Sequence, residues 1–254
     1  PHAILLRADS GEVLAEKDAD STIYPASMTK MMTALLAIEA NPDLDTPVTL
    51  PEEVFPALQA QNASLAGFQP GETATVRDLL YGAMLPSGAE CCEALAREVS
   101  GSEEAFVVRM NQKAAELGMT GTHFCNPTGL HDPEHVSTVR DMARLTEAAL
   151  QNETFRKLFT TERYTVPATN CHPQGFTMHS TLLSQLDGTE LHRGRILGGK
   201  TGYTGEAGLC LASLAEVKGR EYILVTAGAG GDHSTAPYHI EDAVTVYRRV
   251  SRGS

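Results

Sequence analysis

The sequence is short of basic residues: 20 lysines and arginines stand against 32 aspartates and glutamates, a formal net charge of −12 over 254 residues. Phosphate backbones and anionic lipid surfaces repel a chain of this charge, so we expect no nucleic acid partner. The sequence also has no apolar run that approaches the ~20 residues of a membrane span. We therefore expect no transmembrane segment in this chain.

Internal repeats and low-complexity linkers are absent, and apolar residues make up 42% of the chain, enough for one large core. We therefore predict one domain over residues 1–254. No secretory leader is visible, but the chain opens on the strand-like segment PHAILLRADSG. A trimmed start would look the same, so the missing leader does not indicate a cytosolic protein.

Metal and disulfide frameworks are missing as well. The cysteines are odd in number and fit neither a zinc pattern nor a disulfide framework, so we expect them mainly as small buried apolar residues. They are Cys91, Cys92, Cys125, Cys171 and Cys210. The segment LHDPEH offers His131, Asp132 and His135 as ligands, but the spacing of a complete site is not evident, and we expect no metal.

The two ends of the chain have the pattern of strands. Residues 3–16, AILLRADSGEVLAE, predict two short strands around a turn at DSG. After residue 190, the segments GRILGGKTGYT, GLCLASLAE and REYILVTAGA predict three more strands, the last two joined by a tight turn at Lys218-Gly219. The segment IEDAVTVYRRV predicts a closing helix.

The region between the ends is mostly helical in pattern. MTKMMTALLAIEA has apolar residues at 28, 31, 32, 35 and 36, the spacing of one helix face. Four further helices are predicted in TVRDLLYGAML, ECCEALAREVS, SEEAFVVRMNQKAAELG and STVRDMARLTEAALQN. In the third of these, we expect Ser102 to cap the helix and Gly118 to end it. We predict an α+β fold: a five-stranded antiparallel sheet from about 1–24 plus 191–254, edged by the N-terminal hairpin, around a helical insertion over about 25–190.

The segment YPASMTK places Ser27 three residues before Lys30, so the two side chains share one face of a helix. A serine at a helix N-terminus has free backbone N–H groups beside it, which suits a nucleophile whose attack creates an oxyanion. Burial among the neighbouring methionines, or a nearby cation, would lower the pKa of Lys30, so that the neutral amine could take the serine proton. The pattern alone also fits a helix cap at Ser27 and a solvated charge at Lys30.

Two further segments carry groups suited to a site. PSGA puts Ser87 in a loop between two helices, which can present a hydroxyl, although Pro, Ser and Gly are also ordinary turn residues. GGKTGYTGEAG puts Lys200 and Thr201 on a glycine-crowded strand, where a ligand can approach closely and a carboxylate can be bound. A glycine-rich hairpin with a surface lysine is the alternative.

Together and in this order, Ser-x-x-Lys, a loop serine and Lys-Thr-Gly form the signature set of penicillin-interacting serine enzymes. Over nearly its whole length the chain resembles the low-molecular-weight penicillin-binding proteins, the serine-type D-alanyl-D-alanine carboxypeptidases. The resemblance rests on YPASMTK, LLYGAMLPSG, GSEEAFVVRMNQKAAELGMTGTHFCNPTGLHD and GGKTGYTGEAG. It implies a β-lactamase/DD-peptidase-like fold and no cofactor.

The resemblance also implies a mechanism. Ser27 would attack the carbonyl between the two terminal D-alanines of a peptidoglycan stem peptide, with Lys30 as general base. Ser87 would relay the proton toward the departing D-alanine. A β-lactam antibiotic would mimic this substrate and acylate Ser27. Because peptidoglycan is the substrate, the enzyme would act outside the cytoplasmic membrane, exported with its signal peptide removed.

The resemblance places the substrate along the Lys-Thr-Gly strand. Lys200 and Thr201 would hold the terminal carboxylate, and Gly202 and Tyr203 would continue the same binding strand. The backbone N–H groups of Ser27 and Tyr203 would form the oxyanion hole, whose donors stabilise the transition state by several kcal/mol.

One position departs from the family pattern: the second motif usually ends in Asn, and this chain has Ala89. Alanine can bind neither the lysine nor the substrate backbone, and Glu90, Cys91 or a water could fill the gap. The alternatives to a carboxypeptidase are a serine β-lactamase and a non-catalytic peptidoglycan- or β-lactam-binding module. None of the six asparagines follows a Glu by four residues, and Ser-Asp-Asn is absent, which disfavours a class A β-lactamase. The presence of Ser27 and Lys30 disfavours a binding module.

Overall fold

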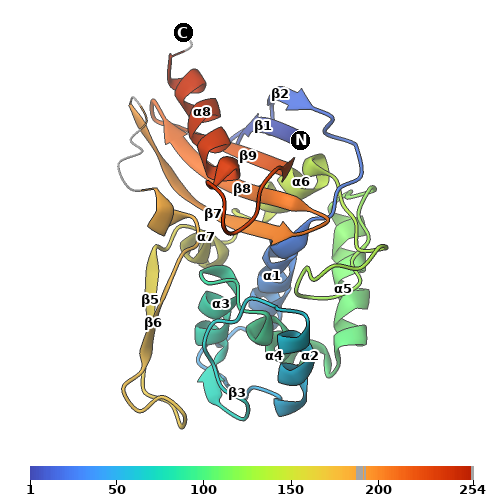
Figure 1. Cartoon of the computed structure of the whole chain (residues 1–254), viewed down its shortest axis with the longest axis vertical. Helices are drawn as coiled ribbons and strands as arrows, with labels where there is room; N and C mark the ends of the chain where they lie inside the picture. Colours follow the sequence, from blue (N-terminus) through green and yellow to red (C-terminus); the bar gives the residue numbers. More distant parts are fainter. Residues whose placement is uncertain (187–190, 192, 253–254) are drawn as a thin grey trace.

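The computed structural model describes residues 1–186, 191 and 193–252 (Figure 1). A five-stranded antiparallel sheet in the order β2-β1-β9-β8-β7 is built from both ends of the chain. Its strands are β1 (His2–Arg7), β2 (Val13–Lys17), β7 (Gly194–Thr204), β8 (Gly208–Val217) and β9 (Arg220–Ala229). The predicted sheet, with the N-terminal hairpin at its edge, is confirmed. The predicted boundary near residue 190 lies outside the described residues.

The turn between β8 and β9 is the predicted tight turn. Lys218 and Gly219 have φ values of +53° and +74°, both in the left-handed region. Two consecutive residues of this kind make the hairpin turn whose twist matches the flanking strands. The turn sets the register in which Val217 pairs with Arg220.

Helices cover both faces of the sheet (Figure 1). α8 (Tyr238–Arg252) packs on β8 and β9 from one side, and α6 (Val139–Ala149) packs on β1 and β9 from the other. Successive side chains of a strand point to opposite faces. In β1, Leu5 joins the apolar core beneath α8, whereas Ile4 and Leu6 join the core of the helical block.

The inserted region is mainly helical, as predicted. Its other helices are α1 (Lys30–Ala40), α2 (Phe55–Ala60), α3 (Val76–Met84), α4 (Ala89–Ser100), α5 (Glu103–Glu116) and α7 (Glu153–Phe159). The predicted cap and stop of α5 are confirmed: Ser102 Oγ accepts from the N–H of Ala105 at 3.2 Å, and Gly118 has a φ of +69°.

Short elements escaped the sequence analysis because they contain too few residues to show a period. They are α2, α7, a two-stranded sheet of β3 (Pro47–Thr49) and β4 (Thr73–Thr75), and a hairpin of β5 (Arg163–Val166) and β6 (Phe176–His179). The hairpin β5–β6 extends along the side of the helical block (Figure 1).

The central helix α1 is buried on every side, although its apolar spacing predicted a single buried face. Residues 30–38 are all buried, and α1 packs against α3, α4, α5 and α6. A helix without a polar face belongs in the interior of a protein. The same packing takes the charged Lys30 out of water.

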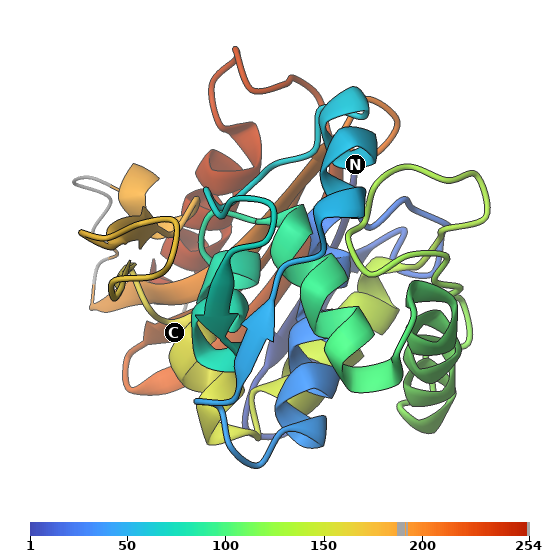
Figure 2. The ribbon, with the colours of Figure 1, turned by 90° about the horizontal axis from the view of Figure 1, so that it is seen from below.

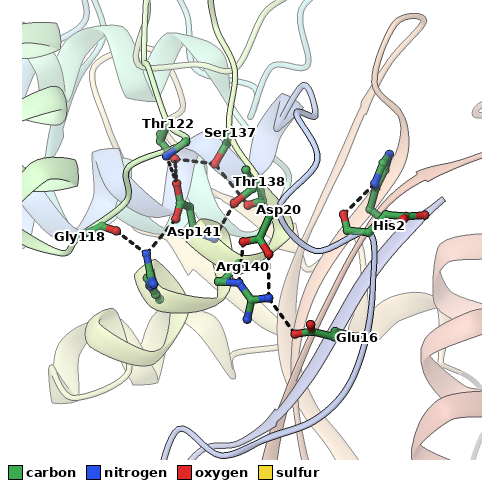
Figure 3. Close-up of polar contacts among 12 residues, drawn as sticks. His2, Glu16, Asp20, Gly118, Thr122, Ser137, Thr138, Arg140 and Asp141 are labelled. Carbon is green, nitrogen blue, oxygen red and sulfur yellow. Dashed lines mark hydrogen bonds and ion pairs between the residues drawn. The ribbon is translucent and has the colours of Figure 1, made fainter.

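Arg140 anchors the chain that follows β2 to α6 (Figure 3). Its Nε donates to Asp20 at 2.7 Å, and a terminal nitrogen donates to Glu16 at 2.8 Å. The hydrogen bond to Asp20, and then the one to Glu16, raise the pKa of Arg140. Ile23 and Ser137 form a backbone bridge beside these contacts. The segment between β2 and α1 is therefore held in place.

Candidate active site

Ser27 lies in η1 (Ala26–Thr29), a short 3-10 turn that leads directly into α1. The capping residue of this turn is Pro25, so the alternative role of Ser27 as a helix cap is wrong. Ala26 has a φ of +46°, in the left-handed region that alanine rarely adopts. Strain of this kind persists only where the surrounding structure enforces it, and it clusters at functional sites.

Lys30 reaches back to Ser27 from the first turn of α1. Its Nζ lies 2.8 Å from Ser27 Oγ and donates to the carbonyl of Thr128 at 2.7 Å. The side chain is 3% exposed, and this burial lowers the pKa of Lys30. The alternative of a solvated surface lysine is therefore wrong, and the amine is placed to accept the hydroxyl proton.

Ser87 and Lys200 bring two of the sequence motifs into direct contact. Lys200 Nζ donates to Ser87 Oγ at 2.9 Å and to the carbonyl of Thr201 at 2.8 Å. Ser87 has a φ of +69° in the turn between α3 and α4. Lys200 is fully buried, and this burial, followed by the charge of Lys30, lowers the pKa of Lys200. The alternative of a surface lysine in a glycine-rich hairpin is wrong.

The strand β7 passes so close to η1 that one position requires glycine. A Cβ on Gly202 would lie 3.0 Å from the backbone nitrogen of Ser27 and 3.2 Å from the Cβ of Ala26. Next to it, Thr201 shares a hydrogen bond of 2.6 Å with Thr181. The cleft beside Ser27 is therefore bounded directly by β7.

Ser27 stands between two halves of one cleft. The strand side, of about 170 Å³, is lined among others by Ser27, Ser64, Ser87, Thr201, Gly202, Tyr203 and His239. The helix side, of about 440 Å³, is lined among others by Ser27, Lys30, Ser64, Ala89, Thr128 and Tyr203. All the predicted site residues line the cleft except Lys200, which lies behind Ser87.

Ala89 begins α4 and lines the helix side of the cleft. Its neighbours in sequence do not replace the missing amide. Glu90 Oε1 accepts from the backbone N–H of Ala66 at 2.6 Å, and the sulfur of Cys91 packs against Gly82. The wall of the cleft at position 89 is therefore a methyl group.

The two histidines of LHDPEH that were candidate metal ligands make structural contacts instead. His135 Nδ1 accepts from the N–H of Cys125 at 2.8 Å, so its Nε2 donates to Thr29 Oγ1 at 2.8 Å. Burial lowers the pKa of His135 to about 4, and His131 packs edge-on against Tyr24. Within the described ranges, no group of three metal-type side chains lies close enough to hold an ion.

The cysteines are all free thiols. Cys91, Cys92 and Cys210 are buried, as expected, whereas Cys125 is partly buried and Cys171 is exposed. Burial raises the pKa of Cys92 to about 12, so this thiol stays neutral between the two buried lysines.

The sequence analysis missed the loop that holds Lys30 from behind. Asn126 Oδ1 accepts from the N–H groups of Thr128 at 3.2 Å and Gly129 at 2.8 Å, a turn that aims the Thr128 carbonyl at Lys30. Gly129 has a φ of +84° and packs so closely on the carbonyl of Ala26 that a Cβ would not fit. The segment Asn-Pro-Thr-Gly predicts a turn, but nothing in the segment itself indicates that the turn contacts Lys30.

Comparisons with known proteins identify the family of the chain. Residues 1–231 match the family described as D-alanyl-D-alanine carboxypeptidase. A D-alanyl-D-alanine carboxypeptidase of Bacillus subtilis, DacF, is 39% identical over 235 residues, covering 89% of this chain and 57% of that protein. A D-alanyl-D-alanine carboxypeptidase of a Streptomyces strain is 34% identical over 226 residues, covering 84% of this chain and 75% of that protein. The chain therefore spans little more than half the length of the Bacillus relative.

Solved structures show the same architecture. A Streptomyces DD-transpeptidase matches with a TM-score of 0.87 at 30% identity, covering 98% of this chain and 96% of that one. A D-alanyl-D-alanine carboxypeptidase of Mycobacterium tuberculosis matches with a TM-score of 0.81 at 28% identity, covering 98% and 90%. These matches confirm the DD-peptidase-like α+β fold. The chain belongs to the D-alanyl-D-alanine carboxypeptidase family of serine peptidases.

Proposed function

We propose that this chain is the catalytic domain of a serine D-alanyl-D-alanine carboxypeptidase, which removes the terminal D-alanine from peptidoglycan stem peptides. The observation that carries the proposal is the 2.8 Å contact between the buried Lys30 Nζ and Ser27 Oγ, where the two halves of the cleft meet. We take residues 1–254 as one domain, with a sheet subdomain of about 1–24 plus 191–254 and a helical subdomain of about 25–190.

In the first step, Ser27 Oγ passes its proton to Lys30 Nζ and attacks the carbonyl carbon between the two D-alanines. Burial favours the neutral amine that this step requires. The carbonyl oxygen becomes an oxyanion, which the backbone N–H groups of Ser27 and Tyr203 stabilise. Gly202 lets β7 approach closely enough for both donors to face one oxygen.

In the second step, the carbon–nitrogen bond breaks and the departing nitrogen takes a proton relayed through Ser87. The leaving D-alanine lies on the strand side, where the Thr201 hydroxyl meets its carboxylate. This carboxylate favours the ammonium form of Lys200, which polarises the Ser87 hydroxyl from behind. Water then adds to the ester carbon, and the shortened peptide leaves Ser27 free.

A β-lactam presents a comparable carboxylate next to a strained amide, so we propose that it acylates Ser27 and inhibits the enzyme. A serine β-lactamase would also need a group that activates water against this ester, and the class A Glu and Asn pattern is absent from the sequence. A non-catalytic module would have no need to bury a lysine against a serine hydroxyl. Both alternatives are therefore less well supported.

Peptidoglycan lies outside the cytoplasmic membrane, so we propose that the protein acts there after export and removal of a signal peptide. Over the part of the chain that the structure describes, no helix has the length and apolar character of a membrane span.

The test is intact mass after incubation with benzylpenicillin, together with D-alanine release from Nα-acetyl-L-Lys-D-Ala-D-Ala. We expect a stable adduct on the native chain and none on Ser27→Ala. Lys30→Arg should acylate at least about a hundredfold more slowly, because arginine stays protonated and cannot act as the base. Ser184→Ala, which lines neither half of the cleft, is the matched control.

Neither adduct nor released D-alanine on the native chain would overturn the catalytic proposal in favour of a binding module. Hydrolysed drug without a lasting adduct would favour a β-lactamase instead.

A further inference from the structure

A separate cavity of about 390 Å³ adjoins the helix side of the cleft. The two spaces share four lining residues, Gln61, Thr128, Leu130 and His131. The cavity is bounded by η2 (Glu52–Val54), α2, α4, the start of α5 and the loop at 125–132. Figure 2 shows α2 beside α4, at the end of the helical block. A group that continues from Ser27 along the helix side of the cleft would therefore enter this cavity.

Glu93 lines the cavity, and one of its carboxyl oxygens is buried without a partner among the described residues. The residue is 6% exposed, and the oxygen without a hydrogen-bond partner is Oε2. Burial raises the pKa of Glu93 to about 7; Glu103 and Glu104 raise it further, and Arg97 opposes them. A buried, unpaired carboxyl group is costly to keep unless a ligand engages it.

The remaining charges around the cavity are mostly negative. Apart from the Cys125 thiol, its ionisable lining residues are Glu53, Glu93, Glu103, Asp132, Arg97 and His131. Arg97 donates through one terminal nitrogen to Glu53 at 2.7 Å, which offsets its charge, while its Nε is buried without a hydrogen-bond partner among the described residues. The cavity therefore favours a cation that carries hydrogen-bond donors. The described residues hold no group of three ligands suited to a metal ion, which points to an organic cation.

Ala89 lies near this carboxyl group along α4. Positions 89 and 93 lie one turn apart on the same face of α4, and they line the helix side of the cleft and the adjoining cavity, respectively. Because Ala89 has only a methyl group, it occupies less of the cleft than the larger amide side chain that the family usually has at this position. The departure from the family motif thus leaves more room in the cleft, one helical turn from Glu93.

We propose that Glu93 is the floor of a substrate subsite that binds a primary ammonium group, carried on the side chain of the residue before D-Ala-D-Ala. This inference rests on the proposed function, because it places the acyl part of the peptide on the helix side of the cleft. Glu93 is a specificity-determining residue in this view: it accepts hydrogen bonds from the ammonium group, and Glu103 adds attraction at longer range.

The test compares two peptides that differ only in the ammonium group. Nα-acetyl-L-Lys-D-Ala-D-Ala carries it, and the norleucine analogue has the same carbon chain without it. The native protein should show a kcat/KM about tenfold higher for the lysine peptide, the size expected of one hydrogen bond to a charged group. Glu93→Gln should remove most of that preference while leaving kcat/KM for the norleucine peptide within about twofold.

Two further variants keep the test decisive. Glu98→Gln changes an exposed carboxylate on the same helix and should keep the native preference. Glu103→Gln, at the mouth of the cavity, should lower the preference about two- to threefold by removing longer-range attraction. An unchanged preference in Glu93→Gln, or no preference in the native protein, would overturn the inference while the proposed function stands. Failure of the native protein to cleave either peptide or to form an acyl-enzyme would overturn both.

Discussion

Lys200 Nζ lies 2.9 Å from Ser87 Oγ, a contact that joins β7 to the turn between α3 and α4. Ser87→Ala removes this acceptor and leaves the buried Lys200 with the Thr201 carbonyl as its acceptor among the described residues. We expect the free energy of unfolding to fall by about 1–3 kcal/mol, the cost of a buried donor that loses a partner, and benzylpenicillin acylation to slow at least tenfold. Urea unfolding and intact-mass time courses measure the two effects. Native values for both would contradict this role for Ser87.

Gly202→Ala should slow acylation because β7 then has to move away from η1. The added Cβ would lie 3.0 Å from the backbone nitrogen of Ser27, closer than ordinary packing allows. A shift of a few tenths of an ångström at a catalytic group is enough to lower the rate about tenfold or more. The control is Gly230→Ala, where a Cβ would meet nothing within 4 Å and which lines neither half of the cleft. Equal acylation rates in the two variants would show that this close approach is unimportant.

Ala89→Asn should change substrate preference more than reactivity. The larger side chain restores the family motif and fills more of the space on the helix side of the cleft, toward Glu93. We expect the preference for the lysine peptide over the norleucine peptide to fall at least threefold, because the ammonium group no longer reaches Glu93 easily. Steady-state kinetics with both peptides measure the ratio. A ratio equal to that of the native protein would mean that the route to Glu93 does not pass position 89.

Glu93 should make the protein less stable as pH rises. Its folded-state pKa is raised from 4.5 to about 7, so the folded state binds this proton more tightly than the unfolded chain. The resulting stability is fully present below about pH 4.5 and is lost as pH rises through about 7. Glu93→Gln removes this dependence, so the variant should gain on the native protein between about pH 5 and about pH 8.

The relative gain should be on the order of 2–3 kcal/mol in the free energy of unfolding, from the size of the pKa shift. Urea unfolding at several pH values measures it, with Glu98→Gln as the exposed control. Parallel stability curves for the native protein and Glu93→Gln would contradict the raised pKa.

Features that depend on a few neighbouring residues were correctly predicted from the sequence. Ser27 and Lys30 meet because positions three apart share a helix face. The chain turns at Lys218-Gly219 because a two-residue hairpin of this kind requires left-handed backbone at both positions, and glycine adopts it readily. The strand pattern at both ends of the chain predicted the five-stranded sheet that the structure confirms. The ordered set of three motifs pointed to the family.

Contacts between distant segments were decided only by the tertiary structure. Nothing near Thr128 in the sequence indicates that its carbonyl meets Lys30, 98 residues away, or that Lys200 lies behind Ser87 rather than in the cleft. The burial of Glu93 beside an open cavity likewise depends on how α4 packs against α2 and α5. Spacing along the chain sets which side chains share a face, whereas desolvation and long-range hydrogen bonds arise only when those faces pack together.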